Sequence, residues 1–121
     1  MRKFLFKGKT ITTNKWIYGG YNYANGSHFI IKSNTDPKYG AFTVYEDSVG
    51  LCTGKFDSDG CLIFENDIVY IFSRYRCAAI KWDKEANMFV IEFDGLCTNF
   101  ANFDSHDCKI VGNIFDDTAE E

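Results

Sequence analysis

The chain has 121 residues, of which 45% are hydrophobic and 17% are aromatic, a composition typical of one folded domain. No run of about 18 apolar residues occurs, which argues against a membrane-spanning segment, and the hydrophobicity is too high for disorder. The formal net charge of −4 conceals a polarity, because residues 1–40 hold seven Lys or Arg and one Asp, whereas residues 41–121 hold six Lys or Arg and sixteen Asp or Glu. This polarity favours attraction between the two halves of the chain or between two copies of it.

The first seven residues include basic side chains but no apolar core of about seven residues, so they do not predict a signal peptide. We therefore expect a cytoplasmic protein without a membrane partner. The chain has five cysteines, an odd number, which we expect to be free thiols buried as small apolar side chains.

Hydrophobic side chains alternate with a period of two along most of the chain, which predicts β-strands. Turn residues interrupt the alternation at Gly19 and Gly20, at Asn25 and Gly26, and at residues 57–60, 83–87 and 94–95. We expect helix only in a short turn at residues 104–108, and the chain contains no visible internal repeat. The side chains predicted to share strand faces are Trp16 and Tyr18; Phe29 and Ile31; Phe42 and Val44; Ile68, Tyr70 and Phe72; Ile80 and Trp82; Phe89, Ile91 and Phe93.

The predicted fold is all-β with minor helix, arranged as one domain over residues 1–121. Short antiparallel strands between residues 62 and 115 predict a closed or nearly closed SH3-like barrel, because closure removes exposed strand edges. Residues 1–48 are expected to add an antiparallel β layer packed on the barrel, residues 49–116 to hold the signature segment and the barrel, and residues 117–121 to form an acidic tail. The expected core side chains are Phe64, Ile68, Ile80, Trp82, Phe89, Ile91, Val111 and Ile114.

Residues 49–69 read VGLCTGKFDSDGCLIFENDIV, with a Gly-x-x-Thr-Gly opening, an Asp-x-x-Gly turn and a closing Glu-Asn-Asp-Ile-Val, and residues 110–115 read IVGNIF. These segments, with the amino end MRKFLFKGKTI…KWIYGGY, resemble the YopX-like family of bacteriophage and prophage proteins. The resemblance implies a phage or prophage origin but assigns no biochemical activity. The residues of these segments that we expect to have structural roles are Thr53, Gly54, Asp57, Gly60, Asp67, Gly112 and Asn113.

The alternating carboxylates at residues 57–60 are similar to a calcium loop, but Lys55 and Asn66 occupy positions where that loop requires acids. We therefore predict a hairpin turn, in which Gly60 adopts a positive φ and Asp57 bonds to nearby backbone. Gly54 is expected in a second turn.

Two other groups of residues suggest chemistry. Glu65 and Asp67 could act as paired carboxylates, but we favour backbone capping by Asp67. Cys97, His106 and Cys108 lack the Cys-x-x-Cys spacing of a zinc site and any local signature of a Cys–His nucleophile. We predict no catalytic residue, no metal site and no cofactor.

Basic and aromatic residues form two candidate contact surfaces for a partner or for nucleic acid, since cations bind phosphates and aromatic rings stack on bases. The sequence pI of about 5.1 favours the alternative, in which the aromatic residues belong to the core and the lysines to a solvated face. The residues of these surfaces are Lys7, Lys9, Lys15, Trp16, Arg74, Tyr75 and Arg76.

The sequence thus favours a non-enzymatic phage or prophage accessory protein that binds an unidentified host or phage protein. Two alternatives remain open: a small acidic inhibitor of a host defence or nucleic-acid enzyme, and a nucleic-acid-binding protein. We also expect a homo-oligomer formed through the amino-terminal strands, with Trp16, Tyr18 or Tyr21 as anchors, and a monomer is the competing outcome.

Overall fold

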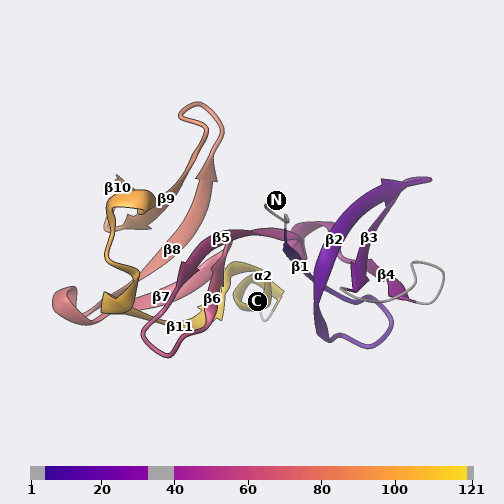
Figure 1. Cartoon of the computed structure of the whole chain (residues 1–121), viewed down its shortest axis with the longest axis horizontal. Helices are drawn as coiled ribbons and strands as arrows, with labels where there is room; N and C mark the ends of the chain where they lie inside the picture. The colour runs from indigo at the N-terminus through magenta and orange to yellow at the C-terminus, as the bar shows by residue number, and fades with distance from the viewer. Residues whose placement is uncertain (1–4, 33–39, 120–121) are drawn as a thin grey trace. The chain divides into compact units, whose positions relative to one another are not determined.

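A computed structural model describes residues 5–32 and 40–119 of the chain (Figure 1). Strands account for 59% and helices for 16%, and all strand pairs are antiparallel, so the prediction of an all-β fold with minor helix is confirmed. The chain divides into two compact units, residues 1–52 (unit 1) and residues 53–121 (unit 2).

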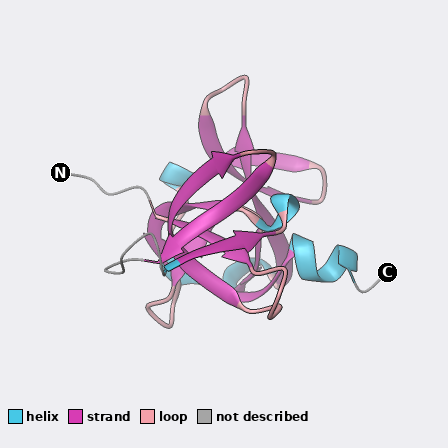
Figure 2. Cartoon of the chain, turned by 90° about the vertical axis from the view of Figure 1, so that its right-hand side faces the viewer, coloured by secondary structure: helices cyan, strands magenta, loops and turns pink. Residues whose placement is uncertain are grey.

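The described strands of unit 1 follow the order β4-β3-β2-β1-β5, and β5 continues into unit 2. A tight turn at Asn25 and Gly26, both with positive φ, joins β2 to β3, as the sequence predicts. Figure 2 shows these strands curling strongly. The elements are β1 (Phe6–Lys9), β2 (Trp16–Ala24), β3 (Ser27–Lys32), β4 (Ala41–Val44), the 3₁₀ helix η1 (Glu46–Ser48) and β5 (Gly50–Phe56).

A single antiparallel bridge pairs Thr10, the residue after β1, with Val44, the last residue of β4. β4 is the strand at one end of this order. Two backbone bonds flank the bridge: Ile11 donates to the Thr43 carbonyl and Tyr45 to the Lys9 carbonyl. The contact is confined to this point and does not make a continuous ladder. Val44 also belongs to the small apolar core of unit 1, together with Ile17 and Ile30.

Gly19 and Gly20 lie inside β2, so the turn predicted there is wrong. A Cβ atom at Gly19 would come within 1.9 Å of the Ile31 carbonyl oxygen on β3. Glycine at this position therefore permits close approach of two backbones within a sheet, which the sequence alone does not distinguish from a turn.

Unit 2 contains the second half of β5 with its neighbour β6, and a separate five-stranded sheet of order β10-β9-β8-β7-β11 (Figure 1). The expected helical turn at residues 104–108 is present as η4. The elements are β6 (Leu62–Phe64), β7 (Asp67–Ile71), η2 (Phe72–Arg74), β8 (Arg76–Asp83), β9 (Met88–Phe93), β10 (Leu96–Asn99), η3 (Phe100–Asn102), η4 (Ser105–Asp107), β11 (Cys108–Asn113) and the helix α2 (Ile114–Ala119).

The structure does not confirm the closed SH3-like barrel. Within the described residues, β10 and β11 are the two ends of the five-stranded sheet and do not pair with each other. The segment 62–64, which we assigned to the barrel, pairs with β5 in the other sheet.

The main core lies in unit 2 and includes Ile63, Ile80, Ile91 and Phe100, all at most 1% exposed. Among the predicted core side chains, Phe64, Ile80 and Ile91 are buried, and Ile68, Phe89 and Ile114 are half-buried. The prediction is wrong for two: Trp82 is 36% and Val111 is 55% exposed. Trp82 lies at the end of β8 beyond the core. Val111 falls in an irregularity of the β11–β7 register, between Ile110 and Gly112, that turns its side chain outward.

The two units share one strand order. In unit 1 and in the five-stranded sheet of unit 2, four successive strands lie side by side in chain order, one 3₁₀ helix (η1) or two (η3 and η4) follow, and the fifth strand returns beside the first. The two strand arrangements are alike, but the sequence shows no visible repeat. Such an arrangement depends on where the turns fall and on which side chains of each strand are buried, and many different sequences meet these two requirements.

Candidate functional site

The signature turn is built around Asp57, whose side chain is only 1% exposed. One carboxylate oxygen, Oδ1, accepts hydrogen bonds from the backbone N–H groups of Asp59 and Cys61, both at 2.9 Å. The other, Oδ2, accepts from the N–H of Ile110 on β11 at 3.0 Å. Gly60 has a φ of 81°, as the turn interpretation requires. Asp57 therefore organises its own turn and also ties the turn to the last strand.

The second half of the signature is likewise held by backbone bonds. Asp67 is 2% exposed, and its Oδ2 accepts a hydrogen bond from the N–H of Phe64 at 2.8 Å. Asn66 has a positive φ of 74°, and its carbonyl accepts from the N–H of Ile114 at 2.8 Å. Asn113 in turn accepts from the N–H of Asp116 at the start of α2. The two segments that resemble the YopX-like family are thus neighbours in the folded chain.

Gly54 does not lie in a turn. It is inside β5 with a φ of 82°, so the predicted turn there is wrong. The neighbouring Thr53 donates its hydroxyl to the Ile63 carbonyl at 2.7 Å, which helps to hold β5 against β6. A glycine with positive φ inside a strand is typical of a local bulge.

Opposing effects act on the pKa of Asp57. Burial raises it, but the N–H bonds from Ile110, Cys61 and Asp59 and the nearby Lys109 charge outweigh burial, so the pKa lies below its usual value. A folded-state pKa below the unfolded value of about 3.9 means that ionised Asp57 stabilises the fold above that pH. The stabilisation is lost as the pH falls through the folded-state pKa.

We therefore expect the free energy of unfolding of the wild type to fall more steeply between about pH 5 and pH 2 than that of Asp57→Asn, which has no charge to lose. Urea unfolding at a series of pH values measures this. The chain has two tryptophans, Trp16 in unit 1 and Trp82 in unit 2, so a Trp16→Phe background leaves fluorescence from unit 2 alone. Equal slopes for the two proteins would contradict the assignment.

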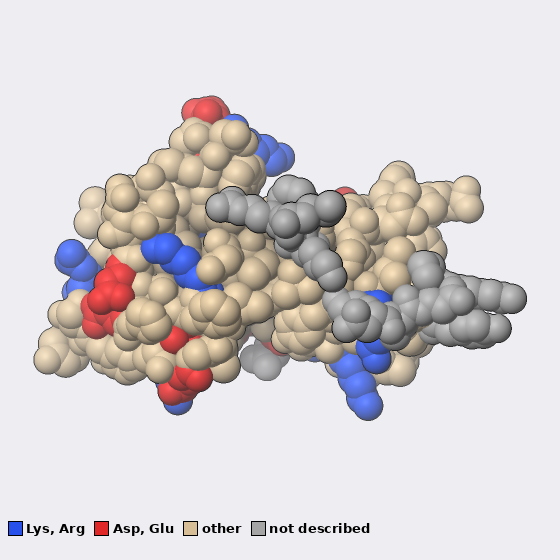
Figure 3. Space-filling model, viewed as in Figure 1, with Lys and Arg blue, Asp and Glu red and all other residues tan. Residues whose placement is uncertain are grey.

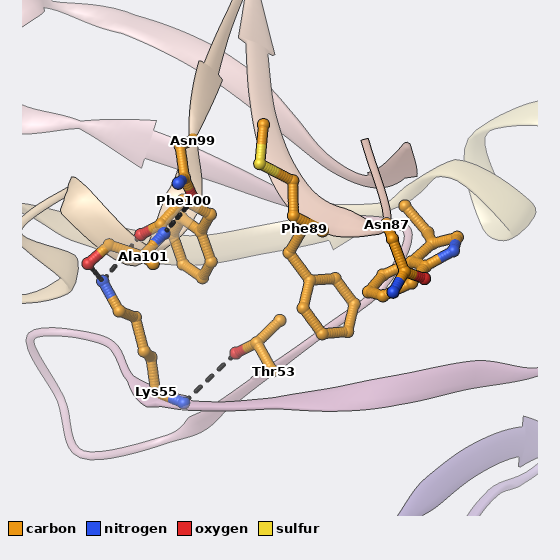
Figure 4. A pocket seen from close by; sticks show the side chains of 9 residues that line it. Thr53, Lys55, Asn87, Phe89, Asn99, Phe100 and Ala101 are labelled. Atoms are coloured by element: carbon orange, nitrogen blue, oxygen red, sulfur yellow. Dashed lines mark hydrogen bonds between the residues drawn. The ribbon is translucent and has the colours of Figure 1, made fainter. Parts of the chain in front are cut away.

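A cavity of about 300 Å³ lies in unit 2 (Figure 4). The aromatic rings of Trp82 and Phe89 meet edge to face, with centroids 4.9 Å apart. In Figure 4 the Phe89 and Phe100 side chains lie opposite Thr53 and Lys55 of β5. The complete lining consists of Thr53, Lys55, Trp82, Asn87, Met88, Phe89, Asn99, Phe100 and Ala101.

The one charged side chain in this lining is bound to the fold. Lys55 Nζ donates to the carbonyl oxygens of Phe100 and Phe103, both at 2.6 Å, and of Ala101 at 3.1 Å. The amine also lies 4.9 Å from the centroid of the Phe100 ring. Desolvation lowers its pKa, and the nearby Asp104 opposes this shift. Lys55 thus holds the η3 region in place and presents an amine whose donors are engaged.

The predicted contact residues of unit 2 lie together on the β7–β8 connection. Tyr75 is 82% exposed with a φ of 53°. Arg74 stacks on the ring of Phe93 at 5.4 Å, and Arg76 forms an ion pair with Asp94. Both guanidinium groups are therefore engaged within unit 2, which weakens this turn as a phosphate-binding surface.

The predicted contact residues of unit 1 are only partly accessible. The structure brings Lys7, Lys9 and Trp16 together, with the two amines 4.7 and 6.0 Å from the indole centroid. Lys7 is only 6% exposed, so its assignment to an exposed basic surface is wrong. Lys15 is exposed, and Trp16 is half-buried.

In the described part of the chain, no three His, Cys, Asp or Glu side chains are placed to hold a metal ion. All five cysteines are free thiols. The expectation that they are buried holds only for Cys108, whose pKa is raised by desolvation and by Asp57 to about 11. Cys61, Cys77 and Cys97 are exposed, which corrects that expectation.

Sequence reasoning missed the cavity. Trp82 and Phe89 were assigned to the core by alternation, while Asn87, Asn99 and Phe100 carried no periodic signal at all. The usable hint was the cluster Asn99-Phe100-Ala101-Asn102, where amide and aromatic side chains interrupt the strand pattern.

These features define a small antiparallel β protein whose signature residues hold its backbone together and whose second unit carries an aromatic cavity. A family model described as YopX protein matches residues 5–119. The chain belongs to the YopX family, which confirms the resemblance seen in residues 49–69 and 110–115. A comparison with curated proteins finds no match. In the described ranges, no helix has the length and apolar character needed to cross a membrane.

Proposed function

We propose that this protein is a non-enzymatic phage or prophage accessory protein that works in the host cytoplasm as a macromolecular interaction module. Its binding site is the aromatic cavity of unit 2, and its partner is a host or phage protein. The single observation that carries the proposal is the composition of that cavity: two accessible aromatic rings, those of Trp82 and Phe89, with amide groups at Asn87 and Asn99. Concave apolar sites with a few polar groups are the usual form of a binding site.

The same lining supports binding over catalysis. Catalysis of proton transfer or acyl transfer requires a side chain that can accept a proton or attack the substrate. Lys55 is the one titratable group in the lining, and three backbone carbonyls engage its amine. The Thr53 hydroxyl donates to the Ile63 carbonyl.

The fold assigned to unit 2 within this proposal is a partly open SH3-like barrel. Support comes from its connectivity, in which β7 to β10 form a meander, η3 and η4 follow, and β11 returns beside β7. The opening between β9, η3 and β5 is where the cavity lies (Figure 4).

The acidic-inhibitor alternative rests on charge. Unit 2 contains six Lys or Arg and fourteen Asp or Glu residues, and most of the acidic side chains visible in Figure 3 belong to it. A surface of this charge attracts basic grooves, including those that bind nucleic acid. Competition between the protein and an oligonucleotide for one host enzyme separates this role from other forms of protein binding.

Nucleic-acid binding is a second candidate, favoured by one feature of unit 1. Lys9 pairs with Trp16 across β1 and β2, and Tyr18, two residues further along β2, is 48% exposed. Exposed rings beside cations suit single strands. The burial of Lys7 weakens this candidate. Band shifts with labelled single strands at about 50 mM salt, lost as salt rises, distinguish it from protein binding.

Self-association is a further proposal for the exposed tyrosines of β2. Tyr18 and Tyr21 are 48% and 36% exposed, and both belong to the anchors expected for a homo-oligomer. Tyr21 is also bonded to His28, with 2.5 Å between Oη and Nδ1, which holds its ring in one orientation. Light scattering at low micromolar concentration distinguishes an oligomer from a monomer.

Filling the cavity is expected to abolish partner binding. Ala101 is exposed and lines the cavity, so Ala101→Trp adds bulk there without removing a core side chain. We expect affinity capture of the tagged full chain from infected host cells, followed by mass spectrometry, to show at least a ten-fold loss of its main partner.

The matched control is Ala86→Trp, the same substitution at an exposed position of the β8–β9 turn outside the cavity lining. It should capture the partner as the wild type does. Equal capture by all three proteins, with unchanged circular dichroism, would place the binding site elsewhere.

A further inference from the structure

The chemistry of the aromatic cavity also restricts what it binds, and this inference rests on the proposed function. A volume of about 300 Å³ lies at the lower end of the range for ligand sites, roughly 300–1,000 Å³. The cavity therefore accommodates one bulky side chain or ring and is too small for a large cofactor. The accessible rings of Trp82 and Phe89 make an apolar or aromatic group the best occupant.

The polar groups of the lining suit a peptide backbone. Asn87 is exposed and lies at the end of the β8–β9 turn. The side-chain oxygen of Asn99 accepts a hydrogen bond from the N–H of Ala101 at 2.9 Å. This bond fixes the orientation of the Asn99 side-chain NH₂ group. Side-chain amides can donate to and accept from main-chain groups, so they can position an extended segment that passes across the opening.

The charges around the cavity favour a cationic partner. Asp83 ends β8, and Lys84 and Glu85 lie in the turn that follows. Asp104 lies close enough to Lys55 to affect its pKa. Hydrogen bonds to backbone carbonyls fix the Lys55 amine but do not cancel its charge, so the preference rests on the acidic excess of unit 2 as a whole. With fourteen acidic and six basic residues in unit 2, this field repels phosphates and attracts Lys and Arg.

We propose that the cavity of unit 2 binds an extended peptide segment of a partner protein that inserts one bulky apolar side chain against Trp82 and Phe89 and carries Lys or Arg beside it. The aromatic lining supplies the anchor site, and the acidic excess of unit 2, to which Asp83, Glu85 and Asp104 contribute, supplies the preference for positive charge. A single-stranded nucleic acid, whose bases could enter the same cavity, is the competing occupant, and its phosphates meet an unfavourable field.

The test is selection of a displayed random-peptide library on the full-length protein, followed by anisotropy titration of the enriched peptides. We expect enrichment of sequences with one Leu, Ile, Met or aromatic residue flanked by Lys or Arg. Ala101→Trp should weaken their binding at least ten-fold, and Ala86→Trp should leave it unchanged. Circular dichroism and thermal unfolding of each variant confirm that it is folded.

Charge is tested separately with Glu85→Lys, since Glu85 is exposed and the described contacts of its residue are made by the backbone. We expect about three- to ten-fold weaker binding at low salt, and a smaller effect at high salt. Asp47→Lys, an exposed position in unit 1, makes the same charge change and should leave binding unaltered.

The other outcomes overturn the inference in distinguishable ways. Enriched peptides that lack Lys and Arg, or that are insensitive to Glu85→Lys, refute the charge preference while the interaction module stands. Binding of a labelled single-stranded oligonucleotide that is lost in Ala101→Trp, without peptide enrichment, assigns the cavity to a base. Partner capture that survives Ala101→Trp refutes the cavity as the site of the proposed function.

Discussion

Replacement of Asp57 by alanine is expected to lower the free energy of unfolding of unit 2 by about 3–4 kcal/mol. The substitution removes the acceptor of three backbone N–H groups, those of Asp59, Cys61 and Ile110. Each buried donor left unsatisfied costs about 1–3 kcal/mol, and partial access of water to the turn reduces the total. Urea unfolding followed by Trp82 fluorescence in the Trp16→Phe background measures the loss.

The control for Asp57 is Asp59→Ala in the same turn. Asp59 is exposed, and its carboxylate lies 3.6 Å from the Lys109 amine in an exposed pair. Such pairs contribute roughly 0–1 kcal/mol, so the control should change stability by less than about 1 kcal/mol. Similar losses for both variants would mean that the turn is sensitive to any substitution and that the three bonds of Asp57 are not its main support.

Replacement of Phe100 by alanine is expected to cost about 3–5 kcal/mol, the usual range for a fully buried Phe. Phe100 is 1% exposed, belongs to the core of unit 2 and stacks on Phe103 with ring centroids 6.1 Å apart. The substitution also removes the ring above which the Lys55 amine lies. Denaturant unfolding monitored through Trp82 gives the change, with circular dichroism as a second probe of the same transition.

Phe56→Ala is the matched control for Phe100. Phe56 is 48% exposed at the end of β5, so truncation of its ring removes little buried surface and should cost less than about 1 kcal/mol. A comparable loss at both positions would show that the ring of Phe100 has no special place in the core.

Much of the strand pattern was predictable from the sequence because it depends on local alternation. Ile80 and Ile91 belong to predicted strand faces, and both are completely buried. The turn at Asn25 and Gly26 was predictable because few residues other than Asn and Gly adopt positive φ. Alternation failed at Trp82 and Val111, since it assigns a side chain to one face of a strand but does not tell where the core ends or where the register shifts.

The candidate site was less predictable. The role of Asp57 in its own turn follows from local sequence, but its bond to Ile110, 53 residues away, depends on where β11 lies. The three carbonyls that bind Lys55 come from η3 and from Phe103, the residue after it, which are 45 to 48 residues away in the sequence. The cavity is formed by β5, the β8–β9 hairpin and η3 together, so no single segment indicates it.

The sequence by itself determined the family, the all-β class and some of the turns, such as Asn25-Gly26 and residues 57–60, because motifs, alternation and positive φ are properties of short segments. Only the tertiary structure decided that Gly19 lies inside a strand, that Lys7 is buried and that aromatic side chains predicted as core line an open cavity. The physical reason is that burial and hydrogen-bond partners depend on which distant strands become neighbours. The sequence limits which strands can pair, and the packing of the whole unit determines which of them do.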